Sequence, residues 1–153
     1  MKSERPDTPV ELKVRALRFL ARREHSRAEL ARKLAPHAES PAALEGVLNE
    51  LAAKRQLSDE RYADARTNWL SRKYGAAKIR QDLKTHGVAD AVIERVSAEG
   101  DAERARAILA RKYRAPVTTR EEKAKRARFL QSRGFSYDVI ARALKVTADD
   151  ENE

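Results

Sequence analysis

The side chains that could carry acid–base, metal or nucleophilic chemistry are few in this chain of 153 residues, and they are not grouped. The three histidines, His25, His37 and His86, stand near the ends of expected helices without an H-E-x-x-H or comparable ligand spacing, so capping or surface roles suffice for them. The chain has no cysteine, which excludes disulfides, thiolate metal sites and thiol catalysis. It also lacks the patterns G-x-x-x-x-G-K-S/T, G-x-G-x-x-G and G-x-S-x-G. We predict no enzymatic activity, no cofactor, no metal site and no small-molecule substrate.

Acidic residues coincide with expected helix starts. Asp59/Glu60 and Glu121/Glu122 each fall in a first helical turn, and Asp101 opens another helix. A carboxylate there meets the positive end of the helix dipole. We interpret these acids as helix-stabilising groups and not as catalytic carboxylates.

The basic side chains indicate one function that these exclusions do not affect, the binding of a polyanion. An Arg-Arg or Arg-Lys pair ends the first helix of each of three expected units, so stacked units would repeat a positive spot along one side. Cations on the second helices extend this stripe. The candidate binding residues are Arg22, Arg23, Arg72, Lys73, Lys78, Arg80, Lys84, Arg111, Lys112, Lys123, Arg126 and Arg133. A cation at a helix C-terminus also stabilises the helix dipole, and spacing alone does not separate the two roles.

The charge balance agrees with an anionic partner. Lysines and arginines number 33 against 24 acids, a formal charge of +9, although residues 149–153 alone carry four carboxylates. Residues 101–133 hold eleven basic and four acidic side chains, which makes this segment the most attractive to polyanions. We expect nucleic acid or a nucleoprotein as the partner. The alternative is that the basic surface only keeps a helical protein soluble.

Six aromatic side chains lie on or beside apolar helical faces, where we predict core packing in preference to stacking on nucleic-acid bases. They are Tyr62, Trp69, Tyr74, Tyr113, Phe129 and Phe135.

A repeated helical unit must position these side chains, because the chain echoes itself twice. The hexapeptide WLSRKY from Trp69 returns 39 residues later as ILARKY, and a G-V/F-x-x-x-V-I-x-R pattern that begins at Gly87 returns at Gly134, 47 residues later. The two offsets indicate an insertion of eight residues, around 115–118. Stacked helical modules bury their apolar faces against their own helices and their neighbours, which favours a binding protein over an enzyme.

Helix start signals predict nine helices. Ser and Thr caps precede the expected N-termini, with capping boxes at residues 8–11 and 26–29, and Gly46 is the one glycine placed inside a helix. The expected spans are 9–23, 27–36, 41–55, 59–73, 76–86, 89–99, 102–113, 119–133 and 137–145. Grouped in threes, they give modules over residues 8–57, 58–100 and 101–146, followed by an acidic flexible tail, 147–153. The predicted fold is all-α: three tandem three-helix modules that form an elongated, curved helical-repeat array.

No membrane segment or leader is expected. The chain contains no stretch of 18 apolar residues, and its first seven residues lack the apolar core of a signal peptide. We expect a cytoplasmic protein that does not engage membranes.

Two stretches of the chain resemble the RecX family, and together they place residues 10–146 within it. The first resembles the middle repeat of that family and reads Leu57-x-Asp59-x-x-Tyr62-Ala63, then Arg72-x-x-Gly75-x-x-Lys78-Ile79-x-x-Asp82-Leu83-x-x-x-Gly87-Val88. The second resembles its last repeat and reads Phe129-Leu130-x-x-Arg133-Gly134-Phe135-Ser136-x-x-x-Ile140. Asp82 stands where the family more often has glutamate, and both residues carry a carboxylate.

The resemblance implies a regulator of RecA, the bacterial recombinase. RecX-like proteins bind along the RecA filament on single-stranded DNA, inhibit its ATPase and strand exchange, and modulate recombination and DNA repair. The implied partners are the RecA filament and the single-stranded DNA within it, with weak direct DNA binding, and we expect the candidate basic residues to make these contacts. Two alternatives stay open. One is a helix-turn-helix-like DNA-binding transcription regulator that reads bases with Glu94, Arg95 and Ser97, and the other is a helical adaptor that ignores nucleic acid.

Overall fold

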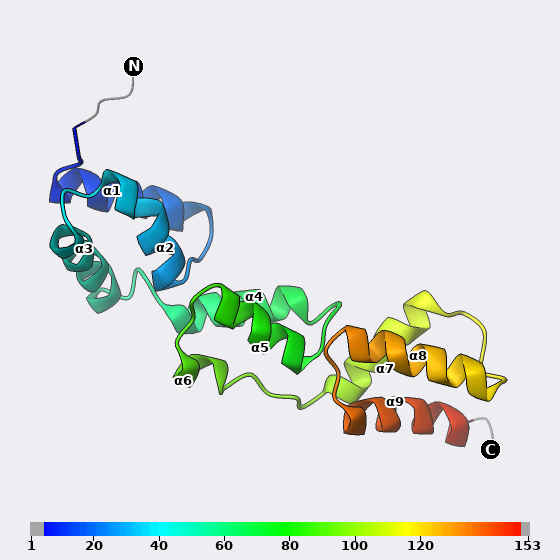
Figure 1. Cartoon of the computed structure of the whole chain (residues 1–153). Coiled ribbons are helices and arrows are strands. Elements are labelled where there is room, and N and C mark those ends of the chain that lie inside the picture. The colour runs from blue at the N-terminus through cyan, green and yellow to red at the C-terminus, as the bar shows by residue number, and fades with distance from the viewer. Residues whose placement is uncertain (1–4, 151–153) are drawn as a thin grey trace. The chain divides into compact units, whose positions relative to one another are not determined.

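The regular secondary structure in the described part of the chain consists of helices. The computed structural model describes residues 5–150, with side chains described for residues 5–145 (Figure 1). The elements are α1 (Pro9–Arg22), α2 (Arg27–Leu34), the 3-10 turn η1 (Ala35–His37), α3 (Pro41–Ala53), α4 (Asp59–Leu70), α5 (Ala76–Thr85), α6 (Asp90–Ile93), α7 (Asp101–Lys112), α8 (Arg120–Ser132) and α9 (Tyr137–Asp150). Extended pairing within these residues is limited to one isolated bridge, in which the Asp7 N–H donates to the His37 carbonyl over 2.8 Å. The all-α prediction is confirmed.

Local capping explains where the first helices begin. The Thr8 hydroxyl accepts the Glu11 N–H at 3.2 Å, and the Glu11 carboxylate accepts the Thr8 N–H at 3.2 Å, which completes the first predicted capping box. At α2 the Ser26 hydroxyl accepts the Glu29 N–H at 3.1 Å, as predicted. The second half of this box is wrong, because the Glu29 carboxylate pairs with the Arg23 guanidinium at 2.7 Å instead.

The predicted helix over 89–99 is reduced to the single turn of α6. Val96 is buried, and its carbonyl accepts a hydrogen bond from the Arg80 guanidinium at 2.6 Å, so it is not paired within a helix. The Ser97 hydroxyl accepts the Glu99 N–H at 3.0 Å, a local bond that competes with helical pairing. These contacts hold residues 94–99 as an irregular connection between α6 and α7.

The last helix extends beyond its predicted end. We predicted an end at residue 145, whereas α9 continues to Asp150. Of the predicted acidic flexible tail, 147–153, residues 147–150 form the end of α9, and residues 151–153 lie outside the described part of the structure.

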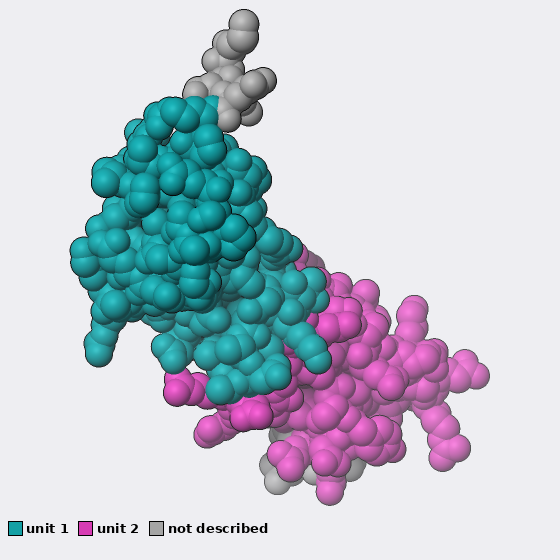
Figure 2. All heavy atoms as spheres, turned by 60° about the vertical axis from the view of Figure 1, so that its left-hand side comes forward, with its two compact units in different colours: residues 1–66, 83–93 teal, residues 67–82, 94–153 magenta. Residues whose placement is uncertain are grey.

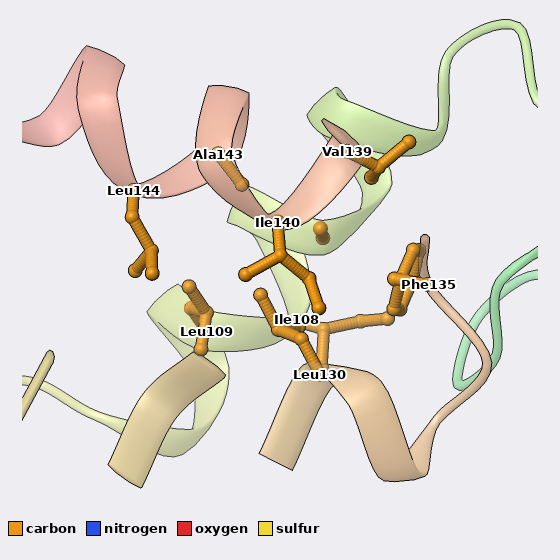
Figure 3. Close-up of a cluster of buried hydrophobic side chains, with 9 residues drawn as sticks. Ile108, Leu109, Leu130, Phe135, Val139, Ile140, Ala143 and Leu144 are labelled. Carbon is orange, nitrogen blue, oxygen red and sulfur yellow. The ribbon is translucent and has the colours of Figure 1, made fainter. Parts of the chain in front are cut away.

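Two compact units make up the chain, one of residues 1–66 and 83–93, the other of residues 67–82 and 94–153 (Figure 2). In the first unit α1, α2 and α3 bury one apolar cluster: Leu12, Ala16, Leu30, Leu34, Val47, Leu48, Leu51 and Leu57. In the second unit α7, α8 and α9 bury another (Figure 3): Ala105, Ile108, Leu109, Leu130, Phe135, Val139, Ile140, Ala143 and Leu144. Each cluster is the core of one three-helix module.

In the first unit, the turn after α5 packs against the start of α2. The His86 carbonyl accepts the Ser26 hydroxyl at 2.6 Å, and Gly87, at φ 76°, lies so close that an added Cβ would be 2.4 Å from the Cβ of Ala28. The carboxylate of Asp59, the first residue of α4, accepts the first backbone N–H of α2 at 2.8 Å. Asp59 therefore caps a helix of the preceding module while it opens its own.

The second unit repeats this junction one module later. The Arg133 carbonyl accepts the N–H of the residue before α5 at 2.8 Å, and an added Cβ on Gly134, at φ 87°, would be 2.4 Å from the Cβ of Lys78. The carboxylate of Asp101, the first residue of α7, accepts the first backbone N–H of α5 at 3.0 Å and pairs with Arg104. The two repeated glycines thus lie at equivalent junctions, where each closely approaches a helix of the preceding module. The two acids also have a second role, which the helix-dipole interpretation missed.

A basic groove as candidate functional site

Five of the twelve predicted binding residues line one groove in the second unit. The groove encloses about 420 Å³ and has no carboxylate among its lining residues. Its apolar members are Ile108 and Phe129, and its cations are Arg72, Lys73, Arg111, Lys112 and Arg133. The echoed Arg-Lys pairs that follow α4 and end α7 therefore meet at one place.

Phe129 holds two of the cations at the groove. The Lys112 Nζ lies 4.0 Å from the centroid of this ring and the Arg133 Cζ lies 5.1 Å from it. Arg133 also lies 5.4 Å from the centroid of the Tyr74 ring. A cation over an aromatic face is attracted by the quadrupole of the ring but keeps its charge. The aromatic rings position the cations without neutralising them.

The positive charge of the groove is not compensated by nearby acids. The Arg111 Nη2 donates to the Arg72 carbonyl at 2.5 Å, a neutral acceptor that links the two echoed segments. None of the five groove cations forms an ion pair with any residue that the structure describes. Like charges gathered in a concave surface raise the local potential and attract anions. A groove with this charge can attract phosphates or carboxylates.

The other predicted binding residues lie elsewhere. Arg23 pairs with a glutamate at 2.7 Å, while Arg80 and Arg126 donate to backbone carbonyls at 2.6 and 2.7 Å. These three guanidinium groups hold the fold together. The remaining four residues are exposed and do not line the groove: Arg22, Lys78, Lys84 and Lys123.

Trp69 contradicts the predicted core role, because it is 64% exposed. It stands three and four residues before Arg72 and Lys73, which is about one helical turn. Trp69 follows the buried Tyr62 by seven residues, a spacing that places both on the same side of α4, so the periodicity contains no signal of its exposure. Of the other five aromatic residues, Tyr62 and Phe135 are buried as predicted, and three are half-buried.

His25 is also not the surface or capping group that the sequence suggests, since it is 1% exposed. Its Nδ1 lies 3.0 Å from the Arg23 carbonyl and its Nε2 lies 2.8 Å from the Lys33 Nζ. Burial lowers the pKa of His25, so the ring is neutral, donates from Nδ1 and accepts the ammonium proton at Nε2. This histidine is a structural group of the first module.

Within residues 5–145, no three histidine, aspartate or glutamate side chains gather as ligands for a metal ion. Nor does this part of the chain contain a helix with the length and apolar character needed to cross a membrane.

Three descriptions of one protein family match successive parts of the chain. Residues 13–51 match "RecX, first three-helix domain", residues 58–96 match the second such domain, and residues 99–144 match the third. The chain belongs to the RecX family.

Relatives with the name "Regulatory protein RecX" cover nearly the whole chain. The protein of Leptothrix cholodnii is 45% identical over 100% of this chain and 98% of its own length, and that of Herbaspirillum seropedicae is 42% identical over 97% and 98%. The crystal structure of RecX from Lactobacillus salivarius has a TM-score of 0.81 at 21% identity and covers 92% of this chain and 96% of its own. A second crystal structure, of a regulatory protein RecX, has a TM-score of 0.71 at 22% identity over 90% and 74%. The relatives support a regulatory role, and the solved structures support the fold.

In this RecX chain the groove draws on two of the matched domains. Arg72 and Lys73 belong to the second, whereas Arg111, Lys112 and Arg133 belong to the third. The groove therefore requires both domains, which are also joined by the hydrogen bond from the Ala76 N–H of the second to the Asp101 carboxylate of the third.

Proposed function

We propose that this RecX-family protein regulates RecA by binding the RecA filament on single-stranded DNA, where it inhibits the RecA ATPase and strand exchange and so modulates recombination and DNA repair. The basic groove is the observation that carries the proposal. Its five uncompensated cations suit the phosphodiester backbone within the filament or an acidic face of RecA. With this partner we also propose a cytoplasmic location.

The groove also supports weak direct binding to bare single-stranded DNA. Each phosphate that a cation neutralises contributes about −0.7 to the slope of log K against log salt for a single strand. If the five groove cations contact about three to five phosphates, the slope is about −2 to −3.5. Binding would be salt-dependent and indifferent to sequence, since guanidinium and ammonium contacts to phosphate carry no sequence information.

The modules are proposed to extend beyond the matched residues, over 8–57, 58–100 and 101–146. The junctions support these limits. Asp59 and Asp101 each stand in the first turn of a module and accept a backbone N–H from the second helix of the module before. Each boundary is thus marked by an acid shared between two helix starts.

A helix-turn-helix transcription regulator is the alternative function. Its expected reading residues, Glu94, Arg95 and Ser97, follow the single turn of α6 and belong to no helix. A recognition helix presents its side chains from a continuous helix in the major groove. The middle module therefore lacks the element that this alternative needs.

Titration of the protein into RecA on single-stranded DNA, with ATP hydrolysis as the readout, tests the proposal. We expect hydrolysis to fall as the protein is added, and we expect tighter binding to RecA-coated than to bare DNA. Sequence-specific binding to duplex DNA, together with unchanged hydrolysis, would favour the transcription regulator instead.

A further inference from the structure

The third module carries a second groove, which the proposed function does not use. It encloses about 480 Å³ and is lined by the second half of α7, the connection after it, Arg126 of α8, and α9. Leu109 and Leu144, which lie side by side at one end of the core of the module (Figure 3), contribute to its apolar lining. Pro116 and Val117 from the connection complete this lining.

This groove exists because of the insertion that distinguishes the third module from the second. The inserted segment, around 115–118, supplies Ala115, Pro116 and Val117 to the lining. Arg126 of α8 holds the segment in place, because its Nη2 donates to the Ala115 carbonyl at 2.7 Å. The Arg126 Cζ also lies 4.6 Å from the centroid of the Tyr113 ring. The insertion thus has a defined position, and the result is an apolar concave surface.

The charge at this groove is entirely positive. Arg106 and Arg114 line it and form no ion pair with any residue that the structure describes, and no acid is among the lining residues. A guanidinium group beside an apolar surface favours a carboxylate, which it binds through two parallel hydrogen bonds. Base stacking is disfavoured, because Tyr113, the aromatic residue of the lining, already contacts Arg126 and lies 6.2 Å, edge to face, from Phe129.

We infer that this groove docks a short, acidic, amphipathic segment of a partner protein. The apolar side chains of that segment contact Leu109, Leu144 and Val117, and its carboxylates pair with Arg106 and Arg114. Amphipathic segments bind apolar grooves in this way, with the apolar face inward and the charged face at the rim. The inference is independent of RecA binding, since the two grooves share no lining residue.

A fluorescein-labelled peptide with leucines on one helical face and glutamates on the other is the probe. We expect fluorescence polarisation to show saturable binding to the full chain. We expect no binding when serines replace the leucines or when glutamines replace the glutamates. Arg106→Gln with Arg114→Gln is expected to weaken binding by roughly tenfold or more. Arg18→Gln with Arg32→Gln, an exposed pair with the same charge change, is expected to weaken it by less than about twofold.

Several results would overturn the inference. The first is a failure of the leucine–glutamate peptide to bind. The second is an equal loss of peptide affinity in the two double arginine variants. The third is binding of the serine peptide as tightly as the leucine peptide, which would mean that charge attraction alone causes binding. If the substitutions at Arg106 and Arg114 weaken the binding of a single-stranded oligonucleotide more than the binding of the peptide, the groove is a nucleic-acid site. If the peptide binds only after residues 147–153 are removed, the occupant is the acidic end of the chain and not a partner. Circular dichroism confirms that each variant is folded.

Discussion

The Asp101 carboxylate is the group whose removal tests the junction between α5 and α7 most sharply. It is 1% exposed, accepts the Ala76 N–H at 3.0 Å and pairs with Arg104. In Asp101→Ala, the Ala76 N–H loses its acceptor, which costs about 1–3 kcal/mol for a buried donor. The loss of the ion pair adds about 1 kcal/mol, because the Arg104 side chain is 31% exposed and water compensates it in part. The free energy of unfolding should fall by about 2–4 kcal/mol, which corresponds to a Tm lower by about 10 °C.

Urea unfolding, followed by far-UV circular dichroism and by the fluorescence of Trp69 in the same unit, measures this loss. Asp101→Asn keeps an acceptor for the Ala76 N–H and removes only the charge, so we expect about half the loss. Asp59→Ala is the matched variant in the first unit. Asp59 is half-buried and accepts the first backbone N–H of α2 at 2.8 Å. We therefore expect its removal to lower the free energy of unfolding by about 1 kcal/mol, as for the removal of a helix cap.

Two outcomes would refute this reasoning. A free energy of unfolding for Asp101→Ala within about 0.5 kcal/mol of the wild type would mean that the carboxylate does not hold the junction. A larger loss in Asp59→Ala than in Asp101→Ala would mean that burial does not set the magnitude.

Three further predictions concern single side chains. Gly46→Ala should raise the free energy of unfolding in urea by about 0.5–1 kcal/mol, because Gly46 is exposed within α3 and an added Cβ meets no atom within 4 Å; a loss would contradict this. Trp69→Ala should cost about 1 kcal/mol or less in thermal unfolding, whereas Phe135→Ala, at a residue 3% exposed, should cost about 3–5 kcal/mol; equal losses would place Trp69 in the core. Burial lowers the pKa of His25 below its usual 6.5, so the unfolded chain binds the proton first and stability should fall as the pH drops below about 6.5, by at most about 1.4 kcal/mol per pH unit. Urea unfolding at about pH 7.5 and about pH 5.5 should show a smaller loss in His25→Gln than in the wild type or in His37→Gln, and equal losses would mean that His25 is not the group responsible.

Helix starts and the repeated unit were predictable because their causes are local. A Ser or Thr cap satisfies N–H groups within three residues, as Thr8 does with Glu11, so the sequence alone contains the interaction. The basic pairs at Arg72 and Arg111 were also predictable as a repeated feature. That they meet in one groove follows from the packing of α7 and α8 with the segment after α4, which spacing does not contain.

Two of the three errors in the prediction have tertiary causes. Residues 94–99 contain no strong helix breaker, yet the helix stops at Ile93, and the Arg80 guanidinium donates a hydrogen bond to the Val96 carbonyl. Asp59 and Asp101 fit a helix-dipole role, and their partners lie in the preceding module, 32 and 25 residues away. His25 is polar by type and buried because the Arg23 carbonyl and Lys33 satisfy its ring. The contacts that decide residues 94–99 and the two acids lie 16 to 32 residues away in the sequence, whereas the contacts of His25 lie two and eight residues away within the first module.

The central claim, that the basic groove makes the regulatory contact with the RecA filament, is tested most directly by ATP hydrolysis of RecA on single-stranded DNA. The measurement compares the wild type, a groove variant in which four cations are reversed to glutamate, and a control with Arg18→Glu and Arg32→Glu. The reversed cations are Arg72, Lys73, Arg111 and Lys112. We predict that the wild type and the control inhibit hydrolysis at similar concentrations, whereas the groove variant, folded by circular dichroism, needs roughly tenfold more protein or fails to inhibit. Inhibition by the groove variant at the wild-type concentration would contradict the claim.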